Sequence, residues 1–417
     1  MEKVKDGYKM TELGEIPVEW DFIDIDTVSE FVGSGVTPKG GQSVYKDEGI
    51  PFIRSQNVYP EGLFLDNVVY IDEEQNEKMK RTQIKDKDIL LNITGASIGR
   101  CTVVPIGFGR GNVNQHVCII RAVKKADPEY ISIFINSEMG KKQIDSFNGG
   151  SSREGLNFQQ VRSIKVFIPT LCEQQKISLI LSSVDEKIEN ADNLIEKTKE
   201  LKKGLMQRLL TKGIGHDRFK DTEIGKIPEE WGIKELGSCV DIRSGNSPSN
   251  FKLNDEGEYP FYKVDDMNYT GKYLTRAKVW FDICNYELMT KGMVVFPKRG
   301  ASIFTNKVAI LSKEGYFDTN VMGLNCKEGL ENEFLFYLLK FIGLQKFADT
   351  TAVPQINNKH INPLIIPIPS FNEQKQIASI LSSVDEKIEQ YEFRKEKLQE
   401  LKKGLMQKLL TGKIRVY

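Results

Sequence analysis

One short glycine-rich stretch offers the chemistry of cofactor binding. Residues Phe31–Gly35 (FVGSG) resemble the loop with which adenine methyltransferases hold S-adenosylmethionine. The chain, however, contains no [DN]PP[YFW] motif to grip a flipped adenine, and the matching residues 241–245 (DIRSG) keep a single glycine. The first glycines also run into a loop that leads to Pro38 rather than into a helix. We therefore interpret this stretch as a turn.

The other candidates for catalysis or metal binding are no stronger. The chain has no GxxxxGK[ST] loop, so ATP hydrolysis is not expected. Its six cysteines form no CxxC pair and its three histidines are isolated, which predicts reduced thiols in a cytoplasmic protein rather than a zinc site. The charged group Asp185–Lys187 (DEK) recurs at 385–387, and a solvated or partner-facing surface explains it better than a nuclease site. The sequence predicts no catalytic, cofactor-binding or metal-binding residue in this chain.

Polar loops in two β-rich stretches carry side chains of the types that proteins use to read DNA. Arginine and lysine pair with guanine edges and asparagine and glutamine with adenine, while lysine, arginine, serine and amides beside glycine bind phosphates. For each single residue an ordinary surface loop is the alternative, so the prediction depends on the whole set. The candidate DNA contacts are Arg54, Gln56, Asn57, Ser97, Arg100, Asn112, Asn114, Gln115 and Arg153 in the first stretch, and Lys263, Lys298, Arg299, Ser302, Asn306, Lys307, Gln355, Asn357, Asn358 and Lys359 in the second.

The overall charge gives DNA binding no general support. Lys+Arg and Asp+Glu both number 58, so the net charge is zero and the basic excess typical of nucleic-acid binders is missing. Any positive charge must sit on local patches that acidic segments balance elsewhere. Residues Met1–Met10 are charged throughout and no run approaches 18 apolar residues, so we expect neither a signal peptide nor a membrane span.

An internal repeat determines the organisation of the chain. Residues Glu173–Glu189 (EQQKISLILSSVDEKIE) return at Glu373–Glu389 with 13 of 17 positions identical, and Glu200–Thr211 (ELKKGLMQRLLT) returns 200 residues later with one change. A leading segment, Thr11–Trp20 (TELGEIPVEW), returns at 222–231. Two long copies are too few for a solenoid, which needs three or more short repeats. Matching ends predict one shared scaffold and partner surface, and divergent middles predict two different ligands.

The matching ends have the pattern of long helices. Thr170 and Ser370 each begin a capping box with the glutamate three residues on, directly after a proline. Apolar residues then recur about every 3.5 positions, typical of a coiled-coil seam, over roughly 39 residues or about 58 Å. The alternative is two amphipathic helices, each packed on its own domain. Chain connectivity favours an antiparallel pair, because the first helix must end near the domain from which the second begins.

The two middles predict globular domains. Residues 21–169 and 232–369 carry short β-rich runs broken by Gly, Pro, Asn and Asp, with few helical pieces. Gly95–Ile98 (GASI) recurs at 300–303. The predicted fold class is α+β: two globular domains, each a twisted β-sheet plus helices, separated by two long antiparallel coiled-coil helices in a pseudo-twofold internal repeat.

Polar helix positions that are identical in both copies indicate a docking surface. A coiled-coil seam alone would fix only its apolar positions, so identity at outward positions suggests that each copy meets the same partner. The predicted docking residues are Ser183, Asp185, Glu186, Lys202, Lys203, Ser383, Asp385, Glu386, Lys402 and Lys403.

These motifs together resemble the specificity subunit of type I restriction–modification systems. The resemblance spans essentially the whole chain and is carried by the GxIPxxW segments at Gly14–Trp20 and Gly225–Trp231, the EQxxI…LSSVDEKI helix starts and the LKKGLMQxLLT helix ends, each present twice. It implies a first target-recognition domain at 1–169, a central helix and linker at 170–221, a second target-recognition domain at 222–369 and a C-terminal helix at 370–417. Each domain would read one half of a bipartite asymmetric double-stranded DNA target.

The resemblance also implies partners. The helices would set the spacer between half-sites and dock two adenine-N6 methyltransferase subunits, and two ATP-driven translocase–nuclease subunits would complete the assembly. S-adenosylmethionine, ATP and Mg would then belong to those partners. Two alternatives remain from the residues alone: a stand-alone adenine DNA methyltransferase, and a coiled-coil scaffold whose end domains bind peptides or sugars.

Overall fold

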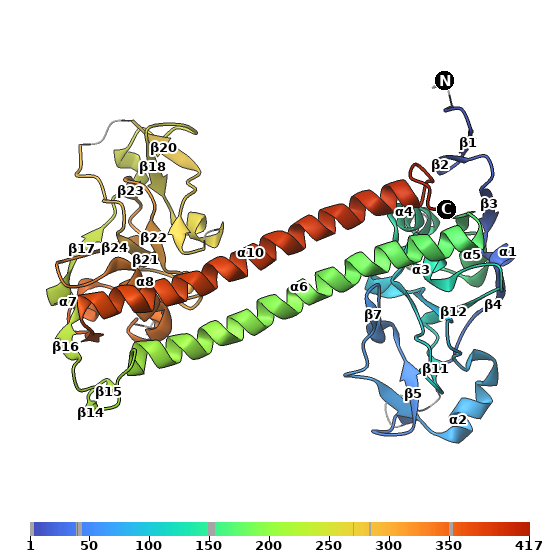
Figure 1. Ribbon diagram of the computed structural model, residues 1–417, viewed down its shortest axis with the longest axis horizontal. Helices are drawn as coiled ribbons and strands as arrows, with labels where there is room; N and C mark the ends of the chain where they lie inside the picture. Colours follow the sequence, from blue (N-terminus) through green and yellow to red (C-terminus); the bar gives the residue numbers. More distant parts are fainter. Residues whose placement is uncertain are drawn as a thin grey trace. The chain divides into compact units, whose positions relative to one another are not determined.

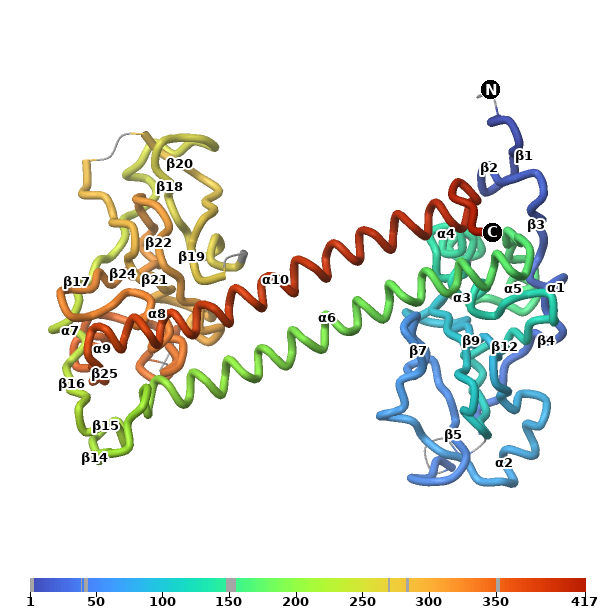
Figure 2. Tube along the Cα trace, viewed as in Figure 1, coloured from blue at the N-terminus to red at the C-terminus, as the bar shows by residue number. Residues whose placement is uncertain are grey.

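The computed structural model describes residues 4–38, 40, 44–148, 155–269, 271–282, 285–349 and 353–417. The chain divides into two compact units (Figures 1 and 2). Unit 1 comprises Met1–Asp192 and Phe393–Tyr417, and unit 2 comprises Asn193–Glu392. The division falls inside the two longest helices, α6 (Leu171–Lys212) and α10 (Phe371–Leu409), so each unit contains one globular part and a portion of both helices.

Unit 1 is built on a four-stranded antiparallel sheet in the order β10-β9-β12-β4. A second sheet, β11-β5-β8, pairs β11 with β5 in parallel. Successive side chains of β9 face two different cores, since Ile89 and Leu91 join the larger hydrophobic cluster and Leu90 joins another. The sheet is therefore covered on both faces, and β9 is apolar at three successive positions, Ile89–Leu91, rather than alternating.

The elements of unit 1 follow one another along the chain. They are β1 (Tyr8–Thr11), β2 (Gly14–Pro17), β3 (Asp21–Asp24), α1 (Ile25–Val28), β4 (Ser29–Ser34), β5 (Ile50–Ile53), β6 (Val58–Tyr59), β7 (Gly62–Leu63), β8 (Val69–Ile71), α2 (Glu73–Lys78), β9 (Ile89–Asn92), β10 (Cys101–Val103), β11 (Asn112–Val113), β12 (Val117–Ala122), α3 (Pro128–Asn136), α4 (Glu138–Asn148), α5 (Phe158–Arg162) and β13 (Lys165–Ile168).

Unit 2 repeats this plan with a five-stranded sheet in the order β17-β24-β21-β22-β19 and a three-stranded sheet, β20-β18-β23. Its central strand β21 again serves two cores, with Val294 in one cluster and Val295 in the other. The elements are β14 (Phe219–Thr222), β15 (Gly225–Pro228), β16 (Gly232–Glu235), α7 (Leu236–Cys239), β17 (Val240–Ser244), β18 (Tyr259–Tyr262), β19 (Tyr273–Leu274), β20 (Val279–Phe281), β21 (Val294–Pro297), β22 (Ala309–Leu311), β23 (Tyr316–Phe317), β24 (Val321–Cys326), α8 (Asn332–Ile342), α9 (Asn358–Ile361) and β25 (Ile365–Ile368).

The two long helices run antiparallel within each unit. In unit 1, Lys402 Nζ lies 2.5 Å from Asp185 Oδ1 and Lys395 Nζ lies 2.5 Å from Asp192 Oδ1, so residue numbers rise along one helix as they fall along the other. In unit 2, Lys202 pairs with Asp385 and Lys199 with Glu392, which gives the same antiparallel sense. The predicted α+β class with paired long helices is confirmed. Among the described residues, no helix is long and apolar enough to span a membrane.

The start of each long helix differs from the predicted capping box. The hydroxyls of Thr170 and Ser370 accept the N–H of Glu173 and Glu373 at 3.3 and 3.2 Å, as predicted. The two glutamates do not bond back to the cap in the described structure. Each carboxylate instead accepts an indole N–H from the leading segment of its own unit.

In unit 1 this buried carboxylate joins three distant parts of the chain. Glu173 Oε2 accepts Trp20 Nε1–H at 3.2 Å, and Arg415, which follows the end of α10, donates to Glu173 Oε1 at 2.7 Å. These hydrogen bonds raise the pKa of Arg415 above its usual range. The negative charge also lies in the first turn of α6, where the helix dipole favours it.

Unit 2 builds the same junction with a histidine where unit 1 has Arg415. Glu373 Oε2 accepts Trp231 Nε1–H at 2.9 Å, and Glu373 Oε1 lies 2.9 Å from His216 Nε2. Gly213, with φ +65°, passes so close to the Trp231 ring that a Cβ there would stand 2.7 Å from it. Gly412 holds the matching position in unit 1, with φ +66°. After each long helix, a glycine with positive φ therefore reverses the direction of the chain. The residues that follow it then reach the first turn of the other long helix.

We predict that Glu173→Ala destabilises unit 1 by about 3 kcal/mol, because it leaves a largely buried guanidinium and an indole N–H without their acceptor. Glu186→Ala, an exposed change on the same helix, should stay within about 0.5 kcal/mol. Urea unfolding followed by circular dichroism measures both. Equal midpoints for the two variants would contradict a structural role for the junction.

Candidate nucleic-acid interface

Three predicted loops of unit 1 lie together. They follow β5, β9 and β11, and backbone and amide bonds join them: Asn114 N donates to Ile53 O at 3.0 Å, and Asn92 Nδ2 donates to Ser55 O at 2.8 Å. Asn92 also donates to Ser97 Oγ at 3.2 Å. The prediction missed Asn92, because it is the last residue of a buried strand rather than part of a polar run. The structure thus brings candidates from three separate segments to one surface.

Two arginines at this surface are held by aromatic rings. The guanidinium of Arg54 lies 5.7 Å from the centre of the Tyr45 ring and donates to Asn67 O at 3.1 Å. Arg100 stacks 4.7 Å from the Tyr59 ring. Both side chains are half-buried, whereas Gln56 and Gln115 are exposed. Stacking reduces the entropy that a cation loses when it binds a base or phosphate.

Three predicted asparagines are placed differently. Asn57, Asn112 and Asn114 are only 1%, 0% and 6% exposed. Asn57 Nδ2 donates to Phe64 O at 2.9 Å, Asn112 Oδ1 accepts from Thr82 Oγ1 at 2.8 Å, and Asn114 Oδ1 accepts from His116 N at 3.0 Å. Because buried amides must be paired, these side chains stabilise the loops and are not open to a ligand. Arg153 lies outside the described residues.

His116 is a residue that the prediction did not select. Its Nδ1 lies 2.6 Å from Thr94 Oγ1, and its Nε2 lies 3.2 Å from Gln115 Nε2. The ring therefore connects the loop after β9 with the exposed Gln115. The only sequence signal was its place in the polar run 110–116.

In unit 2 the basic loop after β21 packs against the segment before α9. Ile356 N donates to Lys298 O at 2.8 Å, and Gly300 N donates to Pro354 O at 2.9 Å. Burial, and then the neighbouring Arg299, lower the pKa of Lys298, whose Nζ lies 3.3 Å from Ser244 Oγ. Arg299 itself is exposed. A partly desolvated lysine beside an exposed arginine presents concentrated positive charge to an anion.

The remaining candidates of unit 2 divide into structural and accessible residues. Asn306 has φ +49° and is fixed by Nδ2 to Lys340 O at 2.9 Å, so it shapes its loop. Asn357 caps α9 through its bonds with His360. Positions that are half-buried or exposed are Lys263 at the end of β18, Ser302, Lys307 with its ammonium on Asn268, Gln355, and Asn358 and Lys359 in the first turn of α9.

The two surfaces share one backbone framework. Leu156 N donates to Ile93 O at 2.8 Å in unit 1, as Ile356 N does to Lys298 O in unit 2. Thr94 pairs with Gly155 as Arg299 pairs with Gln355. The same framework therefore presents different side chains, which suits two reading surfaces with different ligands.

The predicted docking surface needs a correction. Asp185 and Lys402, and likewise Asp385 and Lys202, are half-buried partners in ion pairs between the helices, each at 2.5 Å. Ser183 Oγ and Ser383 Oγ donate to carbonyls of their own helices. Pairing across the helix seam is therefore a second explanation for the repetition of these two aspartates and two lysines. Fully exposed members of the set are Glu186, Lys203, Ser383, Glu386 and Lys403.

Two buried cysteines of unit 1 are poorly placed to act as nucleophiles. Burial raises the pKa of Cys101 and Cys118 to about 12, which disfavours the nucleophilic thiolate. Within the described ranges, no group of three or more His, Cys, Asp and Glu side chains is placed to hold a metal ion.

Comparisons with other proteins point in one direction. Residues 17–200 and 228–403 match the family described as the type I restriction modification DNA specificity domain. The type I restriction enzyme MjaVIII specificity subunit of Methanocaldococcus jannaschii is 29% identical and covers 81% of this chain and 81% of its own length. A relative from the same organism, named as the MjaX specificity subunit, is 29% identical over 99% of this chain and 97% of itself.

Solved structures share the fold over almost the whole chain. The S subunit of a type I restriction–modification system from M. genitalium gives a TM-score of 0.59 at 15% identity, covering 98% of this chain and 97% of that one. A chain from a study of complex assembly and conformational transition of the type I R-M system also gives 0.59, at 17% identity, covering 96% and 99%.

We predict opposite outcomes for two amides that are three residues apart. Asn112→Ala should cost about 1–3 kcal/mol of stability, because it leaves buried donors and acceptors unpaired. Gln115→Ala, at an exposed position, should leave stability within about 0.5 kcal/mol. Thermal unfolding of both variants checks this. A stable Asn112→Ala protein would mean that the loop framework does not depend on that amide.

Proposed function

This chain belongs to the family of type I restriction–modification DNA specificity subunits, and from that premise we propose that each unit reads one half of a bipartite double-stranded DNA target. As a specificity subunit it is a non-catalytic part of its complex. The observation that carries the proposal is the repeated loop framework with different side chains in its two copies. A protein that reads two different half-sites can use the same loop framework twice, with a different set of side chains on each copy.

Specificity for bases would come from the accessible side chains, and affinity for DNA from the arginines that stack on tyrosine rings. Arg299 is exposed on a loop that backbone bonds fix, so its guanidinium can pair bidentately with a guanine edge. Arg54 and Arg100, stacked on tyrosines, suit contact with phosphates or bases of the other half-site. A local basic surface of this kind satisfies DNA binding at zero net charge.

The catalytic groups would belong to partners. We infer two adenine-N6 methyltransferase subunits, which bind S-adenosylmethionine, and two translocase–nuclease subunits, which use ATP and Mg. The helices α6 and α10, each continuous through the division between the units, would set the spacer between the half-sites. We also infer a cytoplasmic location, in keeping with the free thiols of the described cysteines.

The main test of this function is methylome sequencing of a host that expresses the chain with its methyltransferase partner. A bipartite motif with two dissimilar halves is expected. A continuous motif, or methylation independent of this chain, would contradict the proposal. S-adenosylmethionine binding by the purified chain alone would favour the stand-alone methyltransferase instead.

Arg299→Ala is predicted to weaken binding of the intact target by about 1–3 kcal/mol, roughly 5- to 150-fold. The loss should be confined to discrimination at the unit 2 half-site. Competition binding with oligonucleotides changed in one half at a time measures this. Equal relaxation at both halves would show that the two units do not read independently.

Exchange of residues 232–369 for the matching part of a relative should change one half-site only. The framework bonds that present the loops lie within unit 2, so unit 1 keeps its own contacts. Methylome sequencing of the hybrid gives the result directly. A hybrid with two altered half-sites would contradict modular reading.

Docking is best tested at Glu186 and Glu386, because both side chains are exposed and the residue is identical in the two copies of the repeat. Charge reversal at both positions should abolish the complex of two methyltransferase subunits with one specificity subunit. The matched control is reversal at Glu196 and Glu396, which are also identical and exposed, but most of whose neighbours along the helix differ between the two copies. Analytical ultracentrifugation distinguishes the assemblies. A Glu186→Lys/Glu386→Lys protein that still binds two partners would place the docking surface elsewhere.

A further inference from the structure

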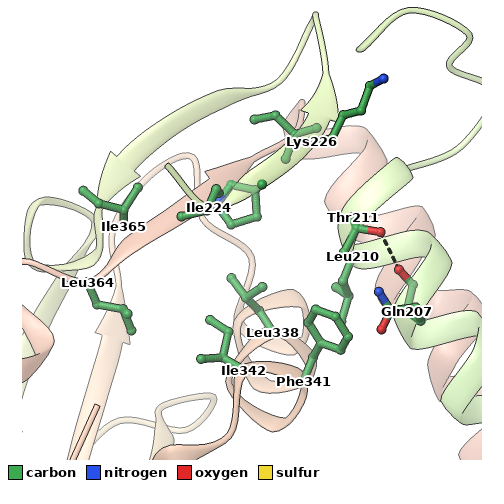
Figure 3. A pocket seen from close by; sticks show the side chains of 13 residues that line it. Gln207, Leu210, Thr211, Ile224, Lys226, Leu338, Phe341, Ile342, Leu364 and Ile365 are labelled. Carbon is green, nitrogen blue, oxygen red and sulfur yellow. Dashed lines mark hydrogen bonds between the residues drawn. The ribbon is translucent and has the colours of Figure 1, made fainter. Parts of the chain in front are cut away.

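Unit 2 contains an apolar groove of about 440 Å³ beside the end of α6. Figure 3 shows its walls: Leu210 from α6, Ile224 from the β14–β15 hairpin, Leu338 and Phe341 from α8, and Ile365 at the start of β25. Apolar concavities of this size on an otherwise polar surface favour a ligand with hydrocarbon side chains.

The same place in unit 1 is occupied by helix α4. Lys165 is the counterpart of Ile365, since each begins the strand that precedes a long helix. Gln143 of α4 bonds both peptide groups of Lys165, with Nε2 to the carbonyl at 3.0 Å and Oε1 to the N–H at 2.8 Å. Leu13, the counterpart of Ile224, packs against the unit 1 core, whereas Ile224 is 37% exposed.

The α4 helix is amphipathic and fits tightly. Ile144 is buried, and Met139 and Phe147 on the same face are half-buried, while Lys141 and Lys142 point outward. Gly140 lets the helix approach α3 so closely that a Cβ would collide with the carbonyl of Ile135. Three turns of helix with one apolar face are thus sufficient to cover this site.

Unit 2 lacks such a helix in its described residues. Its chain leaves α8 through Gly343, with φ +86°, and forms a single 3₁₀ turn at Leu344–Lys346. Phe304 stands where unit 1 has Gly99, the residue that contacts Ile144 of α4, and is 52% exposed. Part of the surface that α4 covers in unit 1 is therefore apolar and exposed among the described residues of unit 2.

The groove also offers a polar feature in a fixed place. Leu236 N bonds Leu364 O on the β16 side of β25, as Ile25 N bonds Ile164 O in unit 1. By the alternation of an antiparallel ladder, the N–H and C=O of Ile365 point away from β16. They match the two groups of Lys165 that Gln143 satisfies. An amide side chain on the ligand would pair with both.

We propose that this groove binds an amphipathic helix of a second protein chain, in the position that α4 takes in unit 1, with one copy per molecule. Like α4, with Met139, Gln143, Ile144 and Phe147, the ligand helix carries apolar residues at i, i+5 and i+8 and a glutamine or asparagine at i+4. Since α4 covers the equivalent site in unit 1, only the groove of unit 2 can bind such a helix. The two repeats therefore differ in this binding site. The proposal does not depend on DNA reading by unit 2.

A peptide copy of α4 serves as the probe. Residues 137–148, labelled with fluorescein and bridged by a lactam between Lys141 and Asp145 to hold the helix, are titrated against the full chain by fluorescence anisotropy. Saturable binding at one site per chain is expected. Gln143→Ala in the peptide should weaken binding several-fold, about 3- to 10-fold, by the loss of the bonds to Ile365.

Variants of the full chain locate the site. Phe341→Ser with Ile342→Glu, which introduces the unit 1 residues found at positions 137 and 138, should lower peptide affinity at least about 10-fold. Phe393→Ser, which removes an exposed phenylalanine from α10, is the matched control and should change nothing. If the double variant fails to fold by circular dichroism, Ile224→Glu on the hairpin replaces it.

Absence of saturable binding, or equal binding by the groove variants and the control, would overturn the proposal. Sedimentation velocity of the chain alone tests whether a second copy of this chain occupies the groove instead. A concentration-dependent dimer that the groove variant abolishes would assign the groove to a second copy of this chain and also overturn it. Binding of target DNA by each variant reports separately on the proposed function.

Discussion

A buried carboxylate in the first turn of each long helix is the contact on which the architecture depends. Glu173 and Glu373 each accept the indole N–H of their unit's leading segment and a bond from the segment that follows the partner helix. Desolvation of a carboxylate is expensive unless its lone pairs are used, so the three segments of each junction must come together. This one requirement fixes where each domain begins and how the helices pair.

The repeat explains why so much could be predicted from the residues. Helices with identical letters 200 positions apart could only serve one shared scaffold, and the antiparallel pairs Asp185–Lys402 and Lys202–Asp385 agree with that prediction. The same letters do not show which way each repeated polar side chain points. A polar residue can be identical in both copies because it pairs with the other helix or because it contacts a second protein. Spacing along one helix does not distinguish these two explanations.

The candidate DNA surface was predictable in outline and not in detail. Residue type selected three loops of unit 1 that the structure brings together, although β9 belongs to one sheet and β5 and β11 to the other. Whether an asparagine faces solvent or satisfies the loop depends on tertiary contacts that sequence does not contain. Asn112 is completely buried, whereas Gln115 in the same run is exposed. Asn92 and Tyr59 support the surface from strands and so carried no loop signal.

The backbone pairing beneath the two surfaces has an evolutionary consequence. Backbone hydrogen bonds join Leu156 to Ile93 in unit 1 and Ile356 to Lys298 in unit 2. Because these bonds use peptide groups, they do not depend on which side chain each residue carries. Neighbouring positions such as Thr94 and Arg299 can then drift without loss of fold. Natural selection can thus exchange the sequences that such a subunit recognises through point substitutions, at little risk to the scaffold, which favours rapid diversification against changing invaders.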